Sequence, residues 1–189
     1  MKVFPSRILF LHSAGHQHGN EGSARLVAYL KATLPGVELI APVMPHPDNP
    51  DYEVWKAALS QIFTILDHNV TLIGHSLGGS VLLKYLSEEK QSHNIAALHL
   101  IAVPFWGAED WEVEEFQLRE DFISTLPPIG SVTIYHSKDD KVVPASHAQL
   151  YADALQAELI LLNGYGHAFS DGLPELVARL KAGKRTTTH

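Results

Sequence analysis

Residues 71–83 read TLIGHSLGGSVLL, and this stretch decides the fold. It joins an apolar, strand-like run to a segment with helical periodicity, and the pattern G-x-S-x-G lies at the junction with Ser76 at its centre. A sharp strand-to-helix turn strains its central residue, so bulky side chains two positions before or after it would collide. Gly74 and Gly78 relieve that crowding. The stretch therefore predicts a strand, a tight turn that lifts the Ser76 hydroxyl above the sheet edge, and a helix.

Ser76 is the candidate nucleophile of this chain. The turn places the backbone amide of Leu77 at the N-terminus of the following helix, where a partial positive charge can receive an oxyanion. A glycine-rich turn that binds phosphate is the structural alternative. The stretch lacks the lysine of a P-loop and the full G-x-G-x-x-G spacing, so the pattern favours a reactive serine.

Short apolar runs alternate with longer periodic segments along the whole chain. The expected strands are 7–12, 37–42, 70–75, 96–102, 131–136 and 157–162. Most are continuously apolar, as expected for a parallel sheet that helices cover on both faces. The pattern predicts an α/β fold, a three-layer doubly wound sandwich of about six mostly parallel strands. We expect one domain over 1–189, with 184–189 as a flexible tail.

The expected helical segments carry apolar faces. The second of these segments, which follows Pro50, also carries signals for a helix start. Trp55 and Leu59 recur there at helical spacing. Asn49 can cap this helix and Pro50 suits its first position. Later in the chain, residues 103–130 predict a loop and an amphipathic helix, with three aromatic residues in the core: Trp111, Phe116 and Phe122.

Composition excludes several classes of protein. The formal net charge of −7 over 189 residues, without a basic stripe, argues against nucleic acid or an anionic membrane surface as a partner. No cysteine is present, which excludes disulfides, thiolate metal sites and a cysteine nucleophile. No apolar run approaches the roughly 20 residues of a membrane span, and the run at 8–12 is too short for a signal core. A cytoplasmic protein is therefore expected.

A serine hydroxyl is a weak nucleophile at neutral pH and needs a base that an acid orients. Both should follow later strands, because parallel sheets bind ligands at the carboxyl ends of their strands. The segment HSKDDKVVP after the fifth expected strand supplies Asp139 or Asp140, and NGYGHAFSDG after the sixth supplies His167. The chain order Ser, Asp, His is the one that this strand-turn-helix architecture uses.

Together, GHSLGG, DDKVVP and the late GH resemble the α/β-hydrolase superfamily over nearly the whole chain. The short chain and the segment APVMPHPDNPDYEVWK resemble, more narrowly, the small serine hydrolases of the YdeN and retinoblastoma-binding-protein type, which have a trimmed sheet and little or no cap. The resemblance implies Ser76 as nucleophile, His167 as base and Asp140, four residues before Pro144, as the orienting acid. Asp139 ranks second, as a solvated loop residue. The resemblance also implies the strand order 2-1-3-4-5-6 and no separate cap domain.

The loop after the first strand, HSAGHQHG at 12–19, is expected to supply a second oxyanion donor. In the superfamily a His-Gly pair usually opens this loop and the amide after the glycine donates, whereas here Ser13 stands in place of that glycine. By position the donor is the amide of Ala14, which would act together with that of Leu77. One lost donor costs about a hundredfold or more in rate.

Five residues near the reactive serine or just beyond strand ends are expected to contact the substrate: His12, Ser13, His75, Phe105 and Trp106. For His75 the simpler interpretation is a packing residue beside the nucleophile. His136 and His147 flank the acid loop, where they are expected to pack or to form hydrogen bonds.

Twelve histidines raise the alternative of a metal site. His12, His16 and His18 lie close together in the loop after the first strand. A metal site needs three or four ligands that converge from fixed positions, usually with a carboxylate or an outer partner, and nothing else in this loop has ligand spacing. We therefore expect no metal and no organic cofactor.

The sequence thus predicts a serine hydrolase that cleaves small or short-chain carboxylic esters through an acyl-enzyme, with a small-molecule ester as its partner. The segment after the fourth strand is too short for a lid domain, so a shallow, open pocket is expected. Two alternatives stay open. One is a hydrolase fold kept as a protein-interaction module with a slack triad, and the other is an acyltransferase that uses the same residues.

Overall fold

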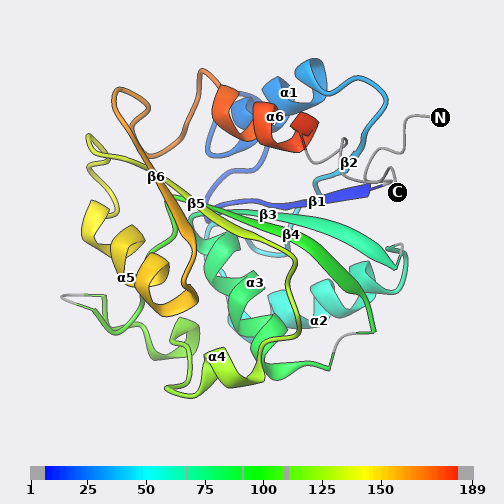
Figure 1. Ribbon diagram of the computed structural model, residues 1–189, viewed down its shortest axis with the longest axis vertical. Helices are drawn as coiled ribbons and strands as arrows, with labels where there is room; N and C mark the ends of the chain where they lie inside the picture. Colours follow the sequence, from blue (N-terminus) through cyan, green and yellow to red (C-terminus); the bar gives the residue numbers. More distant parts are fainter. Residues whose placement is uncertain (1–6, 67, 91, 109–110, 183–189) are drawn as a thin grey trace.

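The computed structural model describes residues 7–66, 68–90, 92–108 and 111–182, and its centre is a six-stranded sheet (Figure 1). The strands are β1 (Arg7–Leu11), β2 (Glu38–Ile40), β3 (Asn69–His75), β4 (Asn94–Ile101), β5 (Val132–Ser137) and β6 (Glu158–Leu162). They lie in the order β2-β1-β3-β4-β5-β6, and every pairing between them is parallel. The predicted fold class and strand order are confirmed.

Helices cover both faces of this sheet, which makes three layers (Figure 1). One face carries α1 (Ala24–Thr33) and α6 (Pro174–Ala182), drawn above the sheet in the view. The opposite face carries α2 (Tyr52–Phe63), α3 (Leu77–Glu88) and α5 (Ala145–Leu155). The short turns η1 (Glu114–Phe116) and α4 (Phe122–Thr125) lie against α3. Within the described residues these elements include no separate cap domain.

Two apolar clusters bury the two faces of the sheet. β1 contributes Leu9 and Leu11 to one cluster and Ile8 and Phe10 to the other, as the two-residue period of a strand dictates. All four side chains are fully buried. A strand buried on both faces is apolar at every position, which is why the sequence pattern identifies it.

The start of α2 differs from the sequence prediction. The helix begins at Tyr52, and its N-cap is Asp51, whose carboxylate accepts a hydrogen bond from the amide of Val54 at 3.0 Å. The amide of Asn49, the predicted cap, belongs to a turn that closes on the carbonyl of His46. Because the chain is still turning at Asn49, the helix starts only where the next capping side chain can reach a free amide.

The segment 103–130 also differs from its prediction. It forms η1 and α4 in place of a longer amphipathic helix. Phe116 and Phe122 are buried as predicted, but Trp111 is only half-buried. Its ring packs edge-on against Trp106 and His147, with centroids 5.1 and 5.5 Å away. Ring contacts of Trp111 and Phe116 with Trp106 anchor the segment, so it needs no continuous helical stripe.

The register of the sheet brings the ends of distant strands together. Leu11 pairs with Gly74, and His75 pairs with Ile101. Because all strands run in the same direction, the loops after β1, β3, β5 and β6 leave the sheet at one edge. This edge carries the candidate site.

Three expectations concern the chain as a whole. In the part of the chain that the structure describes, no helix combines the length and apolar character needed to cross a bilayer. The expected flexible tail, 184–189, lies outside the described residues. The assignment of 1–189 to one domain stays a prediction.

Candidate active site

Ser76 alone forms the turn between β3 and α3. Its backbone has φ 51° and ψ −125°, a conformation that residues with a side chain rarely adopt. The Ser76 amide donates a hydrogen bond of 2.8 Å to the carbonyl of Ile101, which holds the turn against β4. The strained turn that the sequence predicts is therefore present.

Close packing explains the glycines around this turn. A Cβ atom at Gly74 would lie 2.4 Å from the Cα atom of Gly79. A Cβ atom at Gly78 would lie 2.3 and 2.5 Å from the carbonyl oxygens of Leu11 and His12. All of these neighbours are backbone atoms, so a side chain at either glycine would push α3 away from the sheet.

His167 links Asp140 to Ser76. Its Nδ1 lies 2.8 Å from Oδ2 of Asp140, and its Nε2 lies 3.0 Å from Oγ of Ser76. Because a carboxylate can only accept, Nδ1 carries the ring proton and Nε2 faces the serine hydroxyl as an acceptor. Both distances are within the range for proton transfer. Loops after β3, β5 and β6 thus bring the three predicted side chains into one hydrogen-bonded chain.

Backbone amides hold the carboxylate of Asp140 from its other side. Oδ1 accepts hydrogen bonds from the amides of Val142 at 2.8 Å and Val143 at 3.0 Å. Burial acts to raise the pKa of Asp140, but the hydrogen bonds from His167 and from these two amides together outweigh it. The pKa of Asp140 therefore lies below its ordinary value, and the group is charged at neutral pH.

Asp139 has different partners and is exposed. Its Oδ1 accepts hydrogen bonds from the Ser137 hydroxyl and from the amide of Gly164, the latter at 2.8 Å. The Ser137 hydroxyl oxygen in turn accepts the amide of Tyr165 at 3.1 Å. Asp139 therefore ties the end of β5 to the loop that carries His167, while the neighbouring aspartate contacts the imidazole itself.

The two candidate oxyanion donors are the backbone amides of Leu77, which follows Ser76 in the chain, and of Ala14, in the loop after β1. Leu77 is the first residue of α3, and the first amides of a helix have no acceptor within it. The amides of Ser13 and Gly15 are bonded to the Ser23 hydroxyl and the Pro47 carbonyl, at 2.9 and 2.7 Å. Within the described residues, the Ala14 amide between them makes no hydrogen bond. The loop is thus anchored on both sides of its candidate donor.

Three of the five expected substrate-contacting residues are buried: His12, Ser13 and His75. Burial lowers the pKa of His12 to about 4, and burial together with the nearby His167 lowers the pKa of His75 to about 3. Nδ1 of His75 lies 2.7 Å from Oγ of Ser23, and Nε2 lies 2.8 Å from the carbonyl oxygen of His167. The His75 ring has no free polar atom to offer a ligand.

Phe105 and Trp106 follow β4 and are half-buried. The Phe105 amide donates a hydrogen bond of 2.9 Å to Nδ1 of His147, and the Phe105 ring packs on the ring of Tyr151. The indole N–H of Trp106 donates to the hydroxyl of Ser80 at 2.9 Å. These contacts fix both residues beyond the end of β4. Their contact with a substrate stays a prediction.

Sequence reasoning missed one contact of this site, the hydrogen bond between Ser23 and His75. Ser23 occupies the N-cap position of α1, yet its side chain makes no capping hydrogen bond and reaches His75 instead. No local signal distinguishes such a serine from an ordinary cap. His136, expected beside the acid loop, donates from Nε2 to the Val143 carbonyl at 2.9 Å and also lies 3.5 Å from Oδ2 of Asp140.

The histidines of the loop after β1 form no metal site in the part of the chain that the structure describes. Among the residues that the structure describes, no group of three or more His, Asp or Glu side chains is arranged to hold a metal ion. His16 is exposed and lies 3.3 Å from the carboxylate of Asp48. The expectation that no metal or cofactor takes part stays a prediction.

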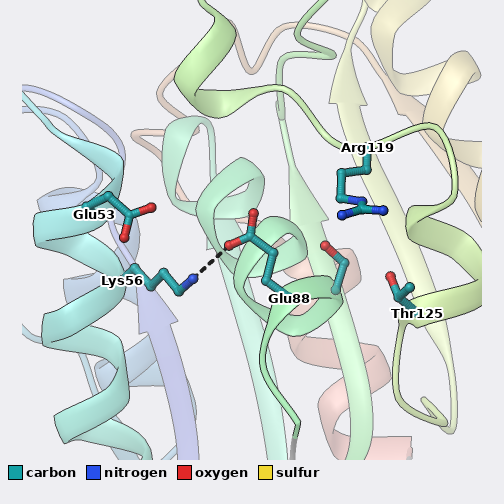
Figure 2. Close-up of a pocket in the computed structure, with 6 residues that line it drawn as sticks. Glu53, Lys56, Glu88, Arg119 and Thr125 are labelled. Carbon is teal, nitrogen blue, oxygen red and sulfur yellow. Dashed lines mark hydrogen bonds and ion pairs between the residues drawn. The ribbon is translucent and has the colours of Figure 1, made fainter.

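A separate hollow of about 550 Å³ lies near the C-terminal end of α3 (Figure 2). Its lining residues are Glu53, Lys56, Ser87, Glu88, Arg119 and Thr125. The ammonium group of Lys56 pairs with the carboxylate of Glu88 at 2.9 Å, across the space between α2 and α3 (Figure 2). The 12 residues of α3 span about 18 Å, so this hollow lies about one helix length from Ser76 and is not part of the site.

Comparison with known proteins matches the sequence of this chain to one family. The family model described as serine hydrolase matches residues 16–173, a range that includes Ser76, Asp140 and His167. A curated relative, the hydrolase YdeN of Bacillus subtilis, is 27% identical over 130 residues, which are 68% of each chain.

Solved structures with the same fold include that relative. The crystal structure of the ydeN gene product has a TM-score of 0.77 at 23% identity and covers 94% of this chain and 98% of its own. A YdeN-like hydrolase from Pectobacterium atrosepticum has a TM-score of 0.69 at 19% identity, with 95% and 91% covered. Esterase PE8 has a TM-score of 0.69 at 19% identity, with 95% and 93% covered. At these identities the structures support the fold.

Proposed function

The chain belongs to the serine hydrolase family, and from this premise we propose that it hydrolyses small or short-chain carboxylic esters through an acyl-enzyme formed on Ser76. The observation that carries the proposal is the hydrogen-bonded chain from Asp140 through His167 to Ser76, with separations of 2.8 and 3.0 Å. An alcohol, a base and an orienting acid in this order are the parts that acyl transfer requires.

In the first half of the proposed reaction, Oγ of Ser76 attacks the ester carbonyl carbon, and Nε2 of His167 takes the hydroxyl proton. The imidazole becomes positively charged in this step. Asp140 stabilises that charge, and it keeps the proton on Nδ1 so that Nε2 is free to act as the base. The carboxylate suits this role because its pKa is lowered and it stays ionised.

The negative charge of the tetrahedral intermediate forms on the former carbonyl oxygen. We assign its stabilisation to the amides of Leu77 and Ala14, one at the start of α3 and one in the loop after β1. The protonated Nε2 then donates its proton to the leaving alcohol, and the acyl group stays on Ser76.

In the second half, water replaces the alcohol. His167 removes a proton from the water as it attacks the acyl carbon, and returns that proton to Oγ of Ser76 when the carboxylic acid leaves. The reaction balances with ester and water as the only reactants. Neither a metal nor an organic cofactor has a step in it.

Two features support esters with small acyl groups. The chain between β4 and β5 holds only η1 and α4 in its described part, so no lid domain adds walls around Ser76. Phe105 and Trp106 lie beyond the end of β4, where they can provide a short apolar contact. A structural relative carries the name esterase, which agrees with this substrate class.

A panel of p-nitrophenyl esters of increasing acyl length tests the proposal. We expect the wild type to hydrolyse the short esters with the highest kcat/KM, and Ser76→Ala to lose at least about 10⁴-fold in kcat. Ser60→Ala is a matched control, because Ser60 is half-buried and, among the described residues, its hydroxyl bonds only to its own helix, at the Lys56 carbonyl. Equal activity of Ser76→Ala and wild type would refute the proposal.

A fluorophosphonate probe separates hydrolase chemistry from the protein-interaction alternative. We expect covalent labelling of Ser76 that His167→Ala abolishes. No labelling, or labelling that does not depend on His167, would favour an interaction module. Product analysis with added alcohols or amines distinguishes hydrolysis from acyl transfer, because transfer consumes the added nucleophile in place of water.

A further inference from the structure

The residue directly before the candidate nucleophile has a place in the site that the proposed mechanism does not use. We propose that His75 is a positioning residue that, through a second hydrogen-bonded chain, fixes the backbone of His167 and the oxyanion loop relative to Ser76. This inference rests on the proposed function for its effect on catalysis. The hydrogen-bonded chain itself can be tested without any substrate.

The His75 ring connects two loops that come from opposite ends of the sequence. Nε2 lies 2.8 Å from the carbonyl oxygen of His167, and Nδ1 lies 2.7 Å from Oγ of Ser23. The ring is 1% exposed, so water does not replace either partner. The hydroxyl oxygen of Ser23 lies 3.0 Å from that of Ser13, and it also accepts the Ser13 amide at 2.9 Å.

The direction of each hydrogen bond follows from the partners. A carbonyl oxygen can only accept, so Nε2 of His75 donates to His167. A ring protonated at Nε2 alone must accept at Nδ1, and Ser23 therefore donates its single hydroxyl proton there. In the hydrogen bond between the two serine hydroxyls, Ser13 is therefore the donor and Ser23 the acceptor. Every polar hydrogen in the chain has one acceptor, which defines one tautomer of His75.

Ser23 supplies independent support for this chain. A serine at an N-cap position usually accepts a hydrogen bond from an amide in the first turn of its helix, which stabilises the helix by about 1 kcal/mol. Ser23 is the N-cap of α1 but makes no such bond, and it is completely buried. The hydroxyl is turned away from its own helix and toward His75, as a side chain committed to the site would be.

The chain couples the parts of the site that must stay in register. One end of the chain is the backbone carbonyl of His167, whose side chain is the proposed base. Its other end is Ser13, which directly precedes the candidate donor Ala14, and His75 itself precedes Ser76. The rings of His75 and His167 also lie side by side, with centroids 5.3 Å apart. A shift of about 1 Å in such a constellation can cost about 100-fold in rate.

His75→Phe keeps an aromatic ring and removes both hydrogen bonds. We expect kcat to fall roughly 10- to 100-fold while KM stays within about twofold, because the ring is buried and both of its nitrogens are bonded within the protein. His99→Phe is the matched control, since His99 is also buried, lies on β4, and contacts Tyr135 at 3.4 Å outside the site. We expect a similar loss of stability in the control with kcat within about twofold of wild type.

Nitrogen-15 NMR of histidine-labelled wild type tests the chain without a substrate. We expect His75, identified by its missing signals in His75→Phe, to show a protonated Nε2 and an unprotonated Nδ1 from pH 8 down to pH 5. Ser23→Ala removes the donor to Nδ1, so the histidine signal whose Nδ1 shift changes in that variant identifies His75 even if His75→Phe does not fold. A protonated Nδ1, or a kcat loss in His75→Phe no larger than in His99→Phe, would overturn the inference. A wild type that shows the expected tautomer but no labelling of Ser76 would instead refute the proposed function alone.

Discussion

Asp139 and Asp140 are adjacent in sequence but have different surroundings. The side chain of Asp140 is buried and contacts the imidazole of His167, whereas Asp139 is exposed and connects Ser137 to the amide of Gly164. The first contact can orient a base, and the second supports the loop that carries the base. Substitution of each aspartate by asparagine therefore separates these two contributions.

We expect Asp140→Asn to lower kcat/KM by about 10³- to 10⁴-fold, because an amide no longer keeps the ring proton on Nδ1 of His167. Asp139→Asn retains an oxygen acceptor for Gly164 and loses only the charge, so a decrease below about tenfold is expected. Hydrolysis of p-nitrophenyl acetate by the two purified variants measures both effects. An equal or larger loss for Asp139→Asn would reverse the assignment of the acid.

At the scale of residues, the sequence predicts the side chains that the reaction itself requires. It misses side chains that contact the site only because of how distant segments pack together. Ser76, His167 and a nearby aspartate follow from strand ends and chain order. The choice of Asp140 over Asp139 came from the family resemblance, because both precede the same loop. Ser23 could not be predicted, since a partner 52 residues from His75 depends on the packing of α1 against β3.

At the scale of elements, the junctions between strands and helices use glycine for two different reasons. Gly78 lies against the carbonyl oxygens of Leu11 and His12, where a Cβ atom has no room. Gly36, between α1 and β2, has a φ of 78° with open space around it. Replacement by alanine therefore creates a backbone clash at Gly78 and only conformational strain at Gly36.

We expect Gly78→Ala to lower the free energy of unfolding by about 3 kcal/mol, because α3 must move away from the end of β1. The same movement shifts Ser76 against the oxyanion loop, so kcat should fall at least about tenfold. Gly36→Ala should cost about 1 kcal/mol and leave kcat unchanged. Urea unfolding and ester hydrolysis measure the two quantities, and full activity in Gly78→Ala would show that this contact does not position the turn.

Strands were easier to predict than helix ends or irregular segments. A strand buried on both faces, such as β1, is apolar throughout, and its ends agree with the prediction to within one residue. The start of α2 depends on which side chain reaches a free amide, and Asp51 does so in place of Asn49. The segment 103–130 is held by contacts between aromatic rings that no periodicity encodes.

At the scale of the whole molecule, the alternation of strands and helices predicts the layers but not the order of the strands. β1 lies between β2 and β3 in the sheet. The chain therefore crosses from one side of β1 to the other on its way from β2 through α2 to β3. The apolar pattern of a strand is the same whichever side of β1 the strand lies on, so this pattern does not determine the strand order. The order was implied by the family resemblance, and the candidate site depends on it, because β3 must lie between β1 and β4 for Ser76 to lie beside the oxyanion loop.

Buried neutral histidines should make the stability of the whole fold sensitive to mild acid. Burial lowers the pKa of His12 to about 4 and that of His75 and His99 to about 3, with Arg179 contributing for His99. In the unfolded chain these histidines titrate near pH 6.5. Between those values the unfolded state binds more protons than the folded state, so the free energy of unfolding decreases as the pH falls below 6.5.

Each such histidine contributes up to about 1.4 kcal/mol of lost stability per pH unit in this window. Carboxylates with lowered pKa values, such as Asp140, lose their stabilising contribution only below about pH 5, so urea unfolding between pH 6 and 5 isolates the histidines. His99→Phe removes one of them, and the slope of unfolding free energy against pH between pH 6 and 5 should decrease by about 1.2 kcal/mol per unit. An unchanged slope would mean that His99 is already charged in the folded protein, which its burial beside Tyr135 and its lowered pKa argue against. Burial keeps His75 neutral beside His167, and the same burial of histidines would then determine the pH below which the folded state loses its stability.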